Sequence, residues 1–286
     1  MGFAEAGSAL NSNDVDAAFG NFLDLDAAED FDMLTRVKEA IISGRIDLYL
    51  QPIVSLPSRS TRFFEAFSRL RDAQGQILLP GSYLEAAERA HRIAIIDNLI
   101  LTRSIEALRI HSLADKGLVV FCNISPSTIF DENCFDRFAS YMEGFEDLAE
   151  RIVFEFTLPS VHMMHPRVEQ NMKLLAEQGF AFSVDHVHAL NLDWASLREK
   201  NFRYAKTSAR MLFGNRAVEQ AERAKQALEN QRREIADAGI ELIVEKIERQ
   251  EQFRAAVDAG FDYAQGHLFG AARPAEHYLP VARALT

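Results

Sequence analysis

Charged and amide side chains recur near the ends of short apolar segments of this 286-residue chain. Glu65 stands in RFFEAF, Glu155 stands in VFEFT, and Asp185 ends FAFSVD. An ionised carboxylate in an apolar segment is costly unless it is paired or binds a metal ion. The full set comprises Gln51, Glu65, Asn123, Glu155, Asp185, Lys206, Glu245, Glu248 and Gln265. These side chains therefore either have structural partners or face a common site.

The oxygen-bearing members of this set indicate a site for one hard divalent cation. Carboxylate and amide oxygens suit Mg²⁺, Mn²⁺ or Ca²⁺ better than Zn²⁺. The four candidate ligands are Glu65, Asn123, Glu155 and Asp185. Glu245 can orient a water molecule, Lys206 can balance the carboxylates or act on that water, and Arg69 can pair with a phosphate. For each residue, a structural ion pair or a cap at a strand end is the alternative interpretation.

Longer stretches with helical periodicity separate most of these apolar segments. Strands that alternate with helices predict parallel β/α units, and a closed barrel of such units carries its site at the carboxyl ends of the strands. Segments 45–57 and 62–71 are joined only by a short turn, which predicts an antiparallel first pair. We therefore expect an α/β fold, a modified (β/α)8 barrel similar to a TIM barrel, with an antiparallel first strand.

The composition divides the chain into an acidic lead and one large domain. Residues 1–30 are rich in Asp, Ala and Asn, which predicts a flexible lead or linker. A docking arm for a basic partner is the alternative for this stretch. Residues 31–286 are expected to form one barrel domain, with a first helix over 33–43. The charged pattern over 217–238 predicts a long helix, either with a solvated face or with a partner-binding face.

Charge and cysteine content restrict the classes of partner and compartment. A net charge of −11 disfavours a protein that wraps a polynucleotide, whereas a small phosphate ligand stays compatible. Cys122 and Cys134 indicate a reducing compartment rather than a disulfide framework. No apolar run approaches about 20 residues and no secretory signal follows Met1, so we expect a cytoplasmic location. His162 and His165 have a spacing that can bind metal, but they lack a carboxylate partner, so we expect a loop-and-cap role.

Several short motifs together resemble the EAL domain family, whose active members hydrolyse cyclic di-GMP with two metal ions. The resemblance covers about residues 34–280, and the family's Glu-Ala-Leu stands here as Glu65-Ala66-Phe67, followed by Arg69. The other matching positions are Gln51-Pro52-Ile53, Asn123-Ile124-Ser125, Glu155, Lys206, segment 244–248, and Gln265, Gly266 and Phe269. The resemblance implies a modified (β/α)8 barrel with its first strand antiparallel. It also implies cyclic di-GMP across the barrel mouth, with Phe67 lining it and Phe269 stacked on a guanine.

The departures from the family pattern concern the second metal ion. The family's Asp-Asp-Phe-Gly-Thr-Gly stands here as DHVHAL over 185–190, so the second Asp is His186 and the glycines are absent. Leu158 and Ser208 stand where the family has a Glu and an Asp. Two-metal hydrolysis needs a second carboxylate beside the first, and a histidine brings no negative charge. We expect one nearly complete metal site and a broken second site; His186 as a replacement ligand is the alternative.

The segments FCNIS, VFEFT, SVDHV and VEKIE resemble a non-catalytic branch of the family, the TipF flagellar-positioning proteins of alphaproteobacteria, which act as cyclic di-GMP receptors. That resemblance implies a receptor without efficient hydrolysis that signals to flagellar or polar proteins, in which Glu245 and Lys206 are vestigial catalytic groups. No cofactor is required, and one Mg²⁺, Mn²⁺ or Ca²⁺ ion is optional. The branch carries an upstream membrane and coiled-coil part, so we expect the chain to be the cytoplasmic domain of a membrane-anchored protein.

Two alternatives stay open. The first is a slow, metal-dependent phosphodiesterase that converts cyclic di-GMP to linear pGpG. The second is a barrel that has lost the ligand and works only as a protein-interaction scaffold.

Overall fold

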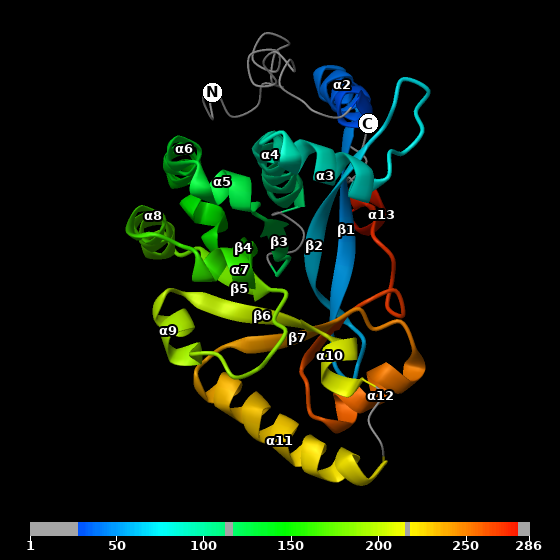
Figure 1. Ribbon diagram of the computed structural model, residues 1–286, viewed down its shortest axis with the longest axis vertical. Coiled ribbons are helices and arrows are strands. Elements are labelled where there is room, and N and C mark those ends of the chain that lie inside the picture. Colours follow the sequence, from blue (N-terminus) through cyan, green and yellow to red (C-terminus); the bar gives the residue numbers. More distant parts are fainter. Residues whose placement is uncertain (1–27, 112–116, 215–217, 280–286) are drawn as a thin grey trace.

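The computed structural model describes residues 28–111, 117–214 and 218–279, which form a closed barrel surrounded by helices (Figure 1). The strand order is β2-β3-β4-β5-β6-β7-β8-β1-β9, and β1 also pairs with β2, which closes the sheet. The strands are β1 (Ile46–Ser55), β2 (Thr61–Leu70), β3 (Val120–Asn123), β4 (Ile152–Thr157), β5 (Ala181–Asp185), β6 (Phe202–Ser208), β7 (Glu241–Glu245), β8 (Tyr263–Gln265) and β9 (Arg273–Pro274). The modified (β/α)8 barrel is confirmed.

The first strand runs against its neighbours, as the short turn after it predicts. β1 is antiparallel to β2 on one side and to β8 on the other, whereas each pair from β2 to β8 is parallel. The two-residue strand β9 adds a further antiparallel pairing to β1, which the sequence did not indicate. The parallel strands therefore direct their carboxyl ends to one mouth of the barrel.

Helices connect the strands and cover the outside of the barrel. They are α2 (Ala28–Ile42), α3 (Pro80–Arg89), α4 (Ile93–His111), α5 (Pro126–Phe130), α6 (Glu132–Met142), the 3₁₀ helix η1 (Glu143–Arg151), α7 (Leu158–His162), α8 (Pro166–Glu177), α9 (Trp194–Glu199), α10 (Ala209–Phe213), α11 (Val218–Asp237), α12 (Gln250–Asp258) and α13 (Ala275–Tyr278). None of the helices formed by the described residues combines the length and the apolar character that crossing a bilayer requires.

Two predicted boundaries shift in the structure. α2 begins at Ala28 instead of residue 33, because helix ends depend on tertiary contacts that periodicity does not reveal. The proposed boundary between lead and barrel therefore falls inside α2, and the lead up to residue 27 lies outside the described residues. His162 is the last residue of α7, and His165 stands at the N-cap position of α8 without a capping hydrogen bond from its side chain.

Alternation along the strands divides the barrel interior into an apolar layer and a polar layer. In β4, for example, Val153 belongs to an interior apolar cluster, Phe154 belongs to the outer core, and the polar Glu155 comes next. Successive side chains of a strand point to opposite faces, so Val153 and Glu155 share the inner face. The apolar layer contains Ile53, Phe63, Phe121, Val153 and Ile243, with Val119, Ala181, Tyr204 and Tyr263 packed against it.

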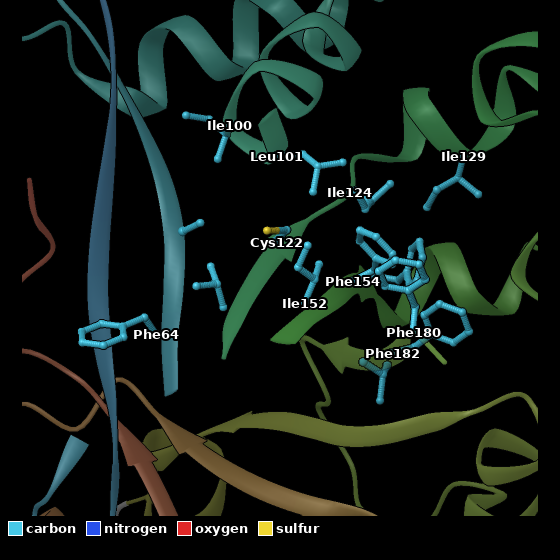
Figure 2. Close-up of a cluster of buried hydrophobic side chains, with 14 of the residues drawn as sticks. Phe64, Ile100, Leu101, Cys122, Ile124, Ile129, Ile152, Phe154, Phe180 and Phe182 are labelled. Carbon is cyan, nitrogen blue, oxygen red and sulfur yellow. The ribbon is translucent and has the colours of Figure 1, made fainter. Parts of the chain in front are cut away.

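The polar layer lies two residues further along each parallel strand and two residues earlier in the antiparallel β1. Its inward-facing members are Gln51, Glu65, Asn123, Glu155, Ser183, Lys206, Glu245 and Gln265, one from each of the eight barrel strands. The intervening residues pack outward against the helices, and Figure 2 shows part of that outer core, including Phe64, Cys122, Phe154 and Phe182. Cys122 is thus a buried apolar residue, as expected from its place in a strand. The fold supplies a polar floor at the mouth from one strand pattern repeated eight times.

Gly266, directly after β8, is required by a close approach of two backbone segments. Its φ of +154° lies in the region that favours glycine, and an added Cβ would collide with the backbone of Ile247. Gly266→Ala is therefore expected to lower the free energy of unfolding by roughly 3 kcal/mol, measured by urea denaturation.

The matched control is Gly75, which has a φ of +81° and open space where its Cβ would lie. Gly75→Ala should cost only about 1 kcal/mol, because backbone strain is its sole penalty. Equal losses for the two variants would show that the contact with Ile247 is unimportant.

Candidate functional site

A buried ammonium group joins two carboxylates at the centre of the polar layer. Lys206 Nζ lies 2.7 Å from Glu65 Oε2 and 2.8 Å from Glu155 Oε1. All three side chains are buried, and Lys206 is only 1% exposed. Breaking a buried pair of this kind leaves an uncompensated charge in a low-dielectric interior, which is strongly unfavourable. Lys206, on β6, is therefore the cation that lets the acids of β2 and β4 lie close together inside the barrel.

Neutral donors complete the hydrogen bonding of both carboxylates. Asn123 Nδ2 donates to Glu65 Oε1 at 2.9 Å, and Gln265 Nε2 donates to Glu65 Oε2 at 2.8 Å. Ser183 Oγ donates to Glu155 Oε2 at 2.9 Å. Every carboxylate oxygen of the two acids thus already accepts a hydrogen bond from the protein.

The two acids respond differently to the same lysine. Burial alone would raise the pKa of Glu65, but Lys206 and the hydrogen bonds from Asn123 and Gln265 lower it overall. Burial raises the pKa of Glu155 to about 8, because the attraction of Lys206 is opposed by the charges of Glu65 and Asp185. Burial would lower the pKa of Lys206, yet Glu155 and Glu65 raise it well above its usual value. The same ammonium group therefore favours the ionised form of Glu65 more than that of Glu155.

Amide side chains extend the network across the antiparallel strand. Gln265 Nε2 also donates to Gln51 Oε1 at 3.2 Å, and Gln51 Nε2 donates to the carbonyl oxygen of Gly270 at 3.1 Å. The acceptor Gln265 Oε1 is buried and has no hydrogen-bond partner among the described residues. A buried acceptor of this kind calls for a water molecule or a ligand donor.

A cavity of about 740 Å³ opens above this polar layer at the barrel mouth. Nine of the residues singled out in the sequence line it: Gln51, Glu65, Phe67, Asn123, Glu155, Asp185, Glu245, Glu248 and Gln265. Apolar residues of α3 and α4, including Leu84, Ile93, Ile96 and Ile100, form one wall. A pocket with an apolar wall and convergent polar groups is the usual form of a small-ligand site.

Three other predicted residues do not line the cavity. Lys206 lies beneath it and reaches it only through Glu65 and Glu155. The guanidinium of Arg69 donates to the carbonyl oxygen of Ser68 at 2.7 Å and lies over the ring of Tyr49. Phe269 packs edge-on against Phe253, with ring centroids 6.0 Å apart. Contact of Arg69 with a phosphate, and of Phe269 with a base, stay predictions that require these side chains to move.

Asp97 is a half-buried acid of the cavity wall that the sequence analysis missed. Its Oδ2 accepts from the backbone N–H of Ser125 at 2.9 Å and from Thr128 Oγ1 at 2.7 Å. Burial raises the pKa of Asp97 to about 6 against these hydrogen bonds. The signal in the sequence was a lone acid in the apolar run IAIIDNLI of a helix. Asp97 thus links α4 by hydrogen bonds to the segment after β3 and helps to position Asn123.

The residues after Asp185 and Glu245 both adopt left-handed backbone conformations. His186 has a φ of +58° and Lys246 a φ of +57°, and both line the cavity. The backbone N–H of His186 donates to Asp185 Oδ1 at 2.6 Å, and Lys246 Nζ lies 2.9 Å from Glu245 Oε1. Non-glycine residues with such φ values concentrate at functional sites, where the surroundings hold them. Lys246 is a second residue that the sequence analysis missed.

The carboxylates do not form a ready metal site in this arrangement. Within the described ranges, no three His, Cys, Asp or Glu side chains lie where they could hold one ion. The oxygens of Glu65 and Glu155 are engaged by Lys206 and by neutral donors, and Asp185 accepts from His186. The donor types suit a hard cation, but their present geometry does not fit one. The single metal site predicted from Glu65, Asn123, Glu155 and Asp185 stays a prediction.

Two departures from the family pattern have local structural roles. Ser208 Oγ accepts from the backbone N–H of Met211 at 3.2 Å and caps α10. Leu158 starts α7 and packs against the outer core. Neither position contributes a carboxylate to the mouth.

Comparison with known proteins identifies relatives of one kind. Residues 35–274 match the model of the EAL domain. The chain is 26% identical over 245 residues to "Cyclic di-GMP phosphodiesterase PdeB" of Shewanella oneidensis, covering 85% of this chain and 28% of that protein. It is 20% identical over 236 residues to "Probable cyclic di-GMP phosphodiesterase PdeG" of Escherichia coli, covering 82% and 46%. The chain thus spans less than half the length of these relatives.

Solved structures share the fold at low sequence identity. "PaMucR Phosphodiesterase, c-di-GMP complex" superposes with a TM-score of 0.74 at 18% identity, covering 87% of this chain and all of that one. The Xanthomonas citri FimX EAL domain in complex with c-diGMP gives a TM-score of 0.71 at 18% identity, covering 86% and 94%. At this identity the likeness concerns the fold.

Removal of the central ammonium group should destabilise the barrel. Lys206→Met leaves Glu65 and Glu155 buried without a cation, so we expect a loss of about 3–5 kcal/mol in urea unfolding. Lys200→Met is the matched control, because Lys200 pairs with Glu169 on the surface at 2.5 Å and should cost about 1 kcal/mol or less. Comparable losses in the two variants would contradict a central role for Lys206.

The raised pKa of Glu155 predicts that stability falls as the pH rises from about 5 to 8. The folded state binds a proton at Glu155 that the unfolded state releases above its ordinary pKa of 4.5, so alkalinity favours unfolding across that window. Glu155→Gln should flatten the dependence of the unfolding free energy on pH, measured by denaturation at pH 5, 6, 7 and 8. A wild-type curve that rises over that window would be inconsistent with a protonated Glu155.

Proposed function

The chain belongs to the EAL domain family, and from that premise we propose that it binds cyclic di-GMP at the barrel mouth without efficient hydrolysis. The observation that carries this proposal is the cavity of about 740 Å³ over a polar floor in which Lys206 is paired with both Glu65 and Glu155. Relatives and structural neighbours named for cyclic di-GMP support the choice of ligand. The protein is then a receptor that reports on the nucleotide.

The cavity offers both kinds of contact that a dinucleotide needs. Its apolar wall from α3 and α4 can accept the flat faces of bases, while Gln51, Asn123 and Gln265 present amide groups beside it. The buried acceptor Gln265 Oε1 is available to a donor of the ligand or to a bridging water. These features support binding independently of any reaction.

Weak hydrolysis is the expected consequence of the altered loop after β5. In a two-metal reaction one ion activates water and both stabilise the developing charge. His186 follows Asp185 where a second acid would be needed, and its Nε2 lies 3.5 Å from Asp185 Oδ2. Glu245, the candidate for orienting water, is paired with Lys246. The carboxylates of Asp185 and Glu245, which would bind metal and orient water, are therefore paired with His186 and Lys246.

Signalling requires that the ligand favours one state of the protein over another. The elements around the cavity, α3, α4 and the segments after β5 and β7, are the ones whose positions a bound nucleotide would bias. We propose flagellar or polar proteins as the partners that read this change, on the resemblance of the strand motifs. On the same resemblance, we propose that the domain acts in the cytoplasm.

A calorimetric titration tests binding. Wild-type protein should release or absorb heat on addition of cyclic di-GMP and not of cyclic di-AMP, and Glu65→Ala should abolish the signal, because Asn123, Lys206 and Gln265 lose their common acceptor. Glu65→Gln keeps the shape of the side chain and replaces Glu65→Ala in the titration if the alanine variant does not fold. Wild-type protein that binds no cyclic di-GMP with or without Mg²⁺ would indicate a scaffold without ligand.

Chromatography of the nucleotide tests the absence of efficient hydrolysis. Incubation of cyclic di-GMP with the protein and Mg²⁺ or Mn²⁺ should leave it intact over hours. Conversion to pGpG that Glu245→Ala removes would establish a phosphodiesterase instead, the second candidate, which the retained Lys206 and Glu245 favour.

A further inference from the structure

The cavity is strongly acidic for a site that is to receive an anion. Seven carboxylic acids line it: Glu65, Glu88, Asp97, Glu155, Asp185, Glu245 and Glu248. Lys246 is the single lysine or arginine among the described residues that line it. Because two phosphodiester groups bring two negative charges, the ligand must meet a cation in the mouth to overcome this repulsion.

Lys246 is placed to provide that cation. It directly follows the end of β7, and its Nζ lies 2.9 Å from Glu245 Oε1, while 61% of its side chain stays exposed. An ammonium group has three donors, so one can bond to Glu245 and two remain for an oxygen of the ligand. Burial would lower the pKa of Lys246, but Glu245 and the more distant Asp185 and Glu65 raise it, so the side chain stays charged over the site.

The backbone holds Lys246 there against its own conformational preference. A φ of +57° disfavours a residue with a side chain, and glycine would adopt it without strain. The next residue is fixed on both sides: the N–H of Ile247 donates to the carbonyl oxygen of Gln265 at 3.0 Å, and the N–H of Leu268 donates to that of Ile247 at 3.1 Å. The side chain is therefore presented from a rigid segment beside Gly266 rather than from a mobile loop.

Lys206 does not supply this charge to a ligand. Its ammonium group is buried beneath the floor and already bonded to two carboxylates. A ligand in the cavity meets those carboxylates before it meets Lys206. The two lysines thus have different roles: Lys206 pairs with the acids of the floor, and Lys246 faces the opening.

We propose that Lys246 is the residue that pairs with a phosphodiester group of the ligand and makes its binding independent of a divalent cation. This inference rests on the proposed function, because it names the cationic contact of the same cavity. Glu245 acts as the positioning residue of Lys246 by accepting one of its hydrogen bonds. The site therefore selects dianionic cyclic dinucleotides over neutral nucleosides through one ammonium group.

Two substitutions separate charge from backbone strain in calorimetric titrations with cyclic di-GMP in EDTA. Lys246→Met keeps the strained φ and removes the charge, whereas Lys246→Gly removes both. Each should weaken binding at least about tenfold, and added NaCl should weaken wild-type binding more than Lys246→Met binding. Lys246→Gly should melt no lower than the wild type, because glycine relaxes the backbone.

Lys173→Met is the matched control for net charge. Lys173 lies on α8 with its side chain 76% exposed, pairs with Glu177 and does not line the cavity. The Lys173→Met protein should bind cyclic di-GMP with the affinity of the wild type. Wild-type binding together with unchanged affinity in Lys246→Met would overturn the inference and leave the proposed function intact. A wild type that fails to bind with Mg²⁺ present would instead refute the proposed function itself.

Discussion

The structure depends on one buried interaction, the bridge from Lys206 Nζ to Glu65 and Glu155. Two carboxylates on neighbouring parts of a closed sheet would repel each other in an interior that water cannot screen. The ammonium group removes that repulsion and aligns β2, β4 and β6 at the same height in the barrel. Asn123, Ser183 and Gln265 complete the arrangement without adding charge. Each carboxylate oxygen of Glu65 and Glu155 therefore has a hydrogen-bond partner within the protein.

This bridge also explains how an acidic mouth can receive an anionic ligand. An active two-metal site uses ions to neutralise carboxylates and to activate water together. Here a protein cation neutralises the floor, and a second lysine over Glu245 faces the cavity. Neutralisation is thereby separated from activation of water. The proposal of binding without efficient hydrolysis rests on this geometry together with the altered loop after β5.

Most of the fold could be predicted from the sequence, because alternation along strands is a strong local signal. VFEFT already contains an inward Glu155 between outward phenylalanines, and the repeated pattern defines eight inner positions. The antiparallel first strand followed from the short turn between β1 and β2. The start of α2 and the pairing of β9 could not be predicted, since two-residue strands and helix ends depend on tertiary contacts rather than on periodicity.

Most side chains that meet at the mouth were predictable because they lie on strands, whereas those that loops or helices supply were not. Glu65, Asn123, Glu155 and Gln265 meet in one network because parallel strands share a mouth. Lys246 and Asp97 were missed, because the importance of Lys246 comes from a backbone angle and that of Asp97 from packing of α4. Arg69 and Phe269 were expected at the ligand, yet local partners, Tyr49 and Phe253, hold them outside the cavity lining.

The most direct test of the central bridge is a titration of Mn²⁺ with the protein, followed by the electron paramagnetic resonance signal of the free ion. If Lys206 occupies the place between Glu65 and Glu155, wild-type protein should leave that signal unchanged at equimolar concentration, with and without cyclic di-GMP. The contradicting result is a fall in the free-ion signal that corresponds to one bound Mn²⁺ per chain and that is absent in Glu155→Gln. A metal ion, and not the lysine, would then balance the acids of the floor.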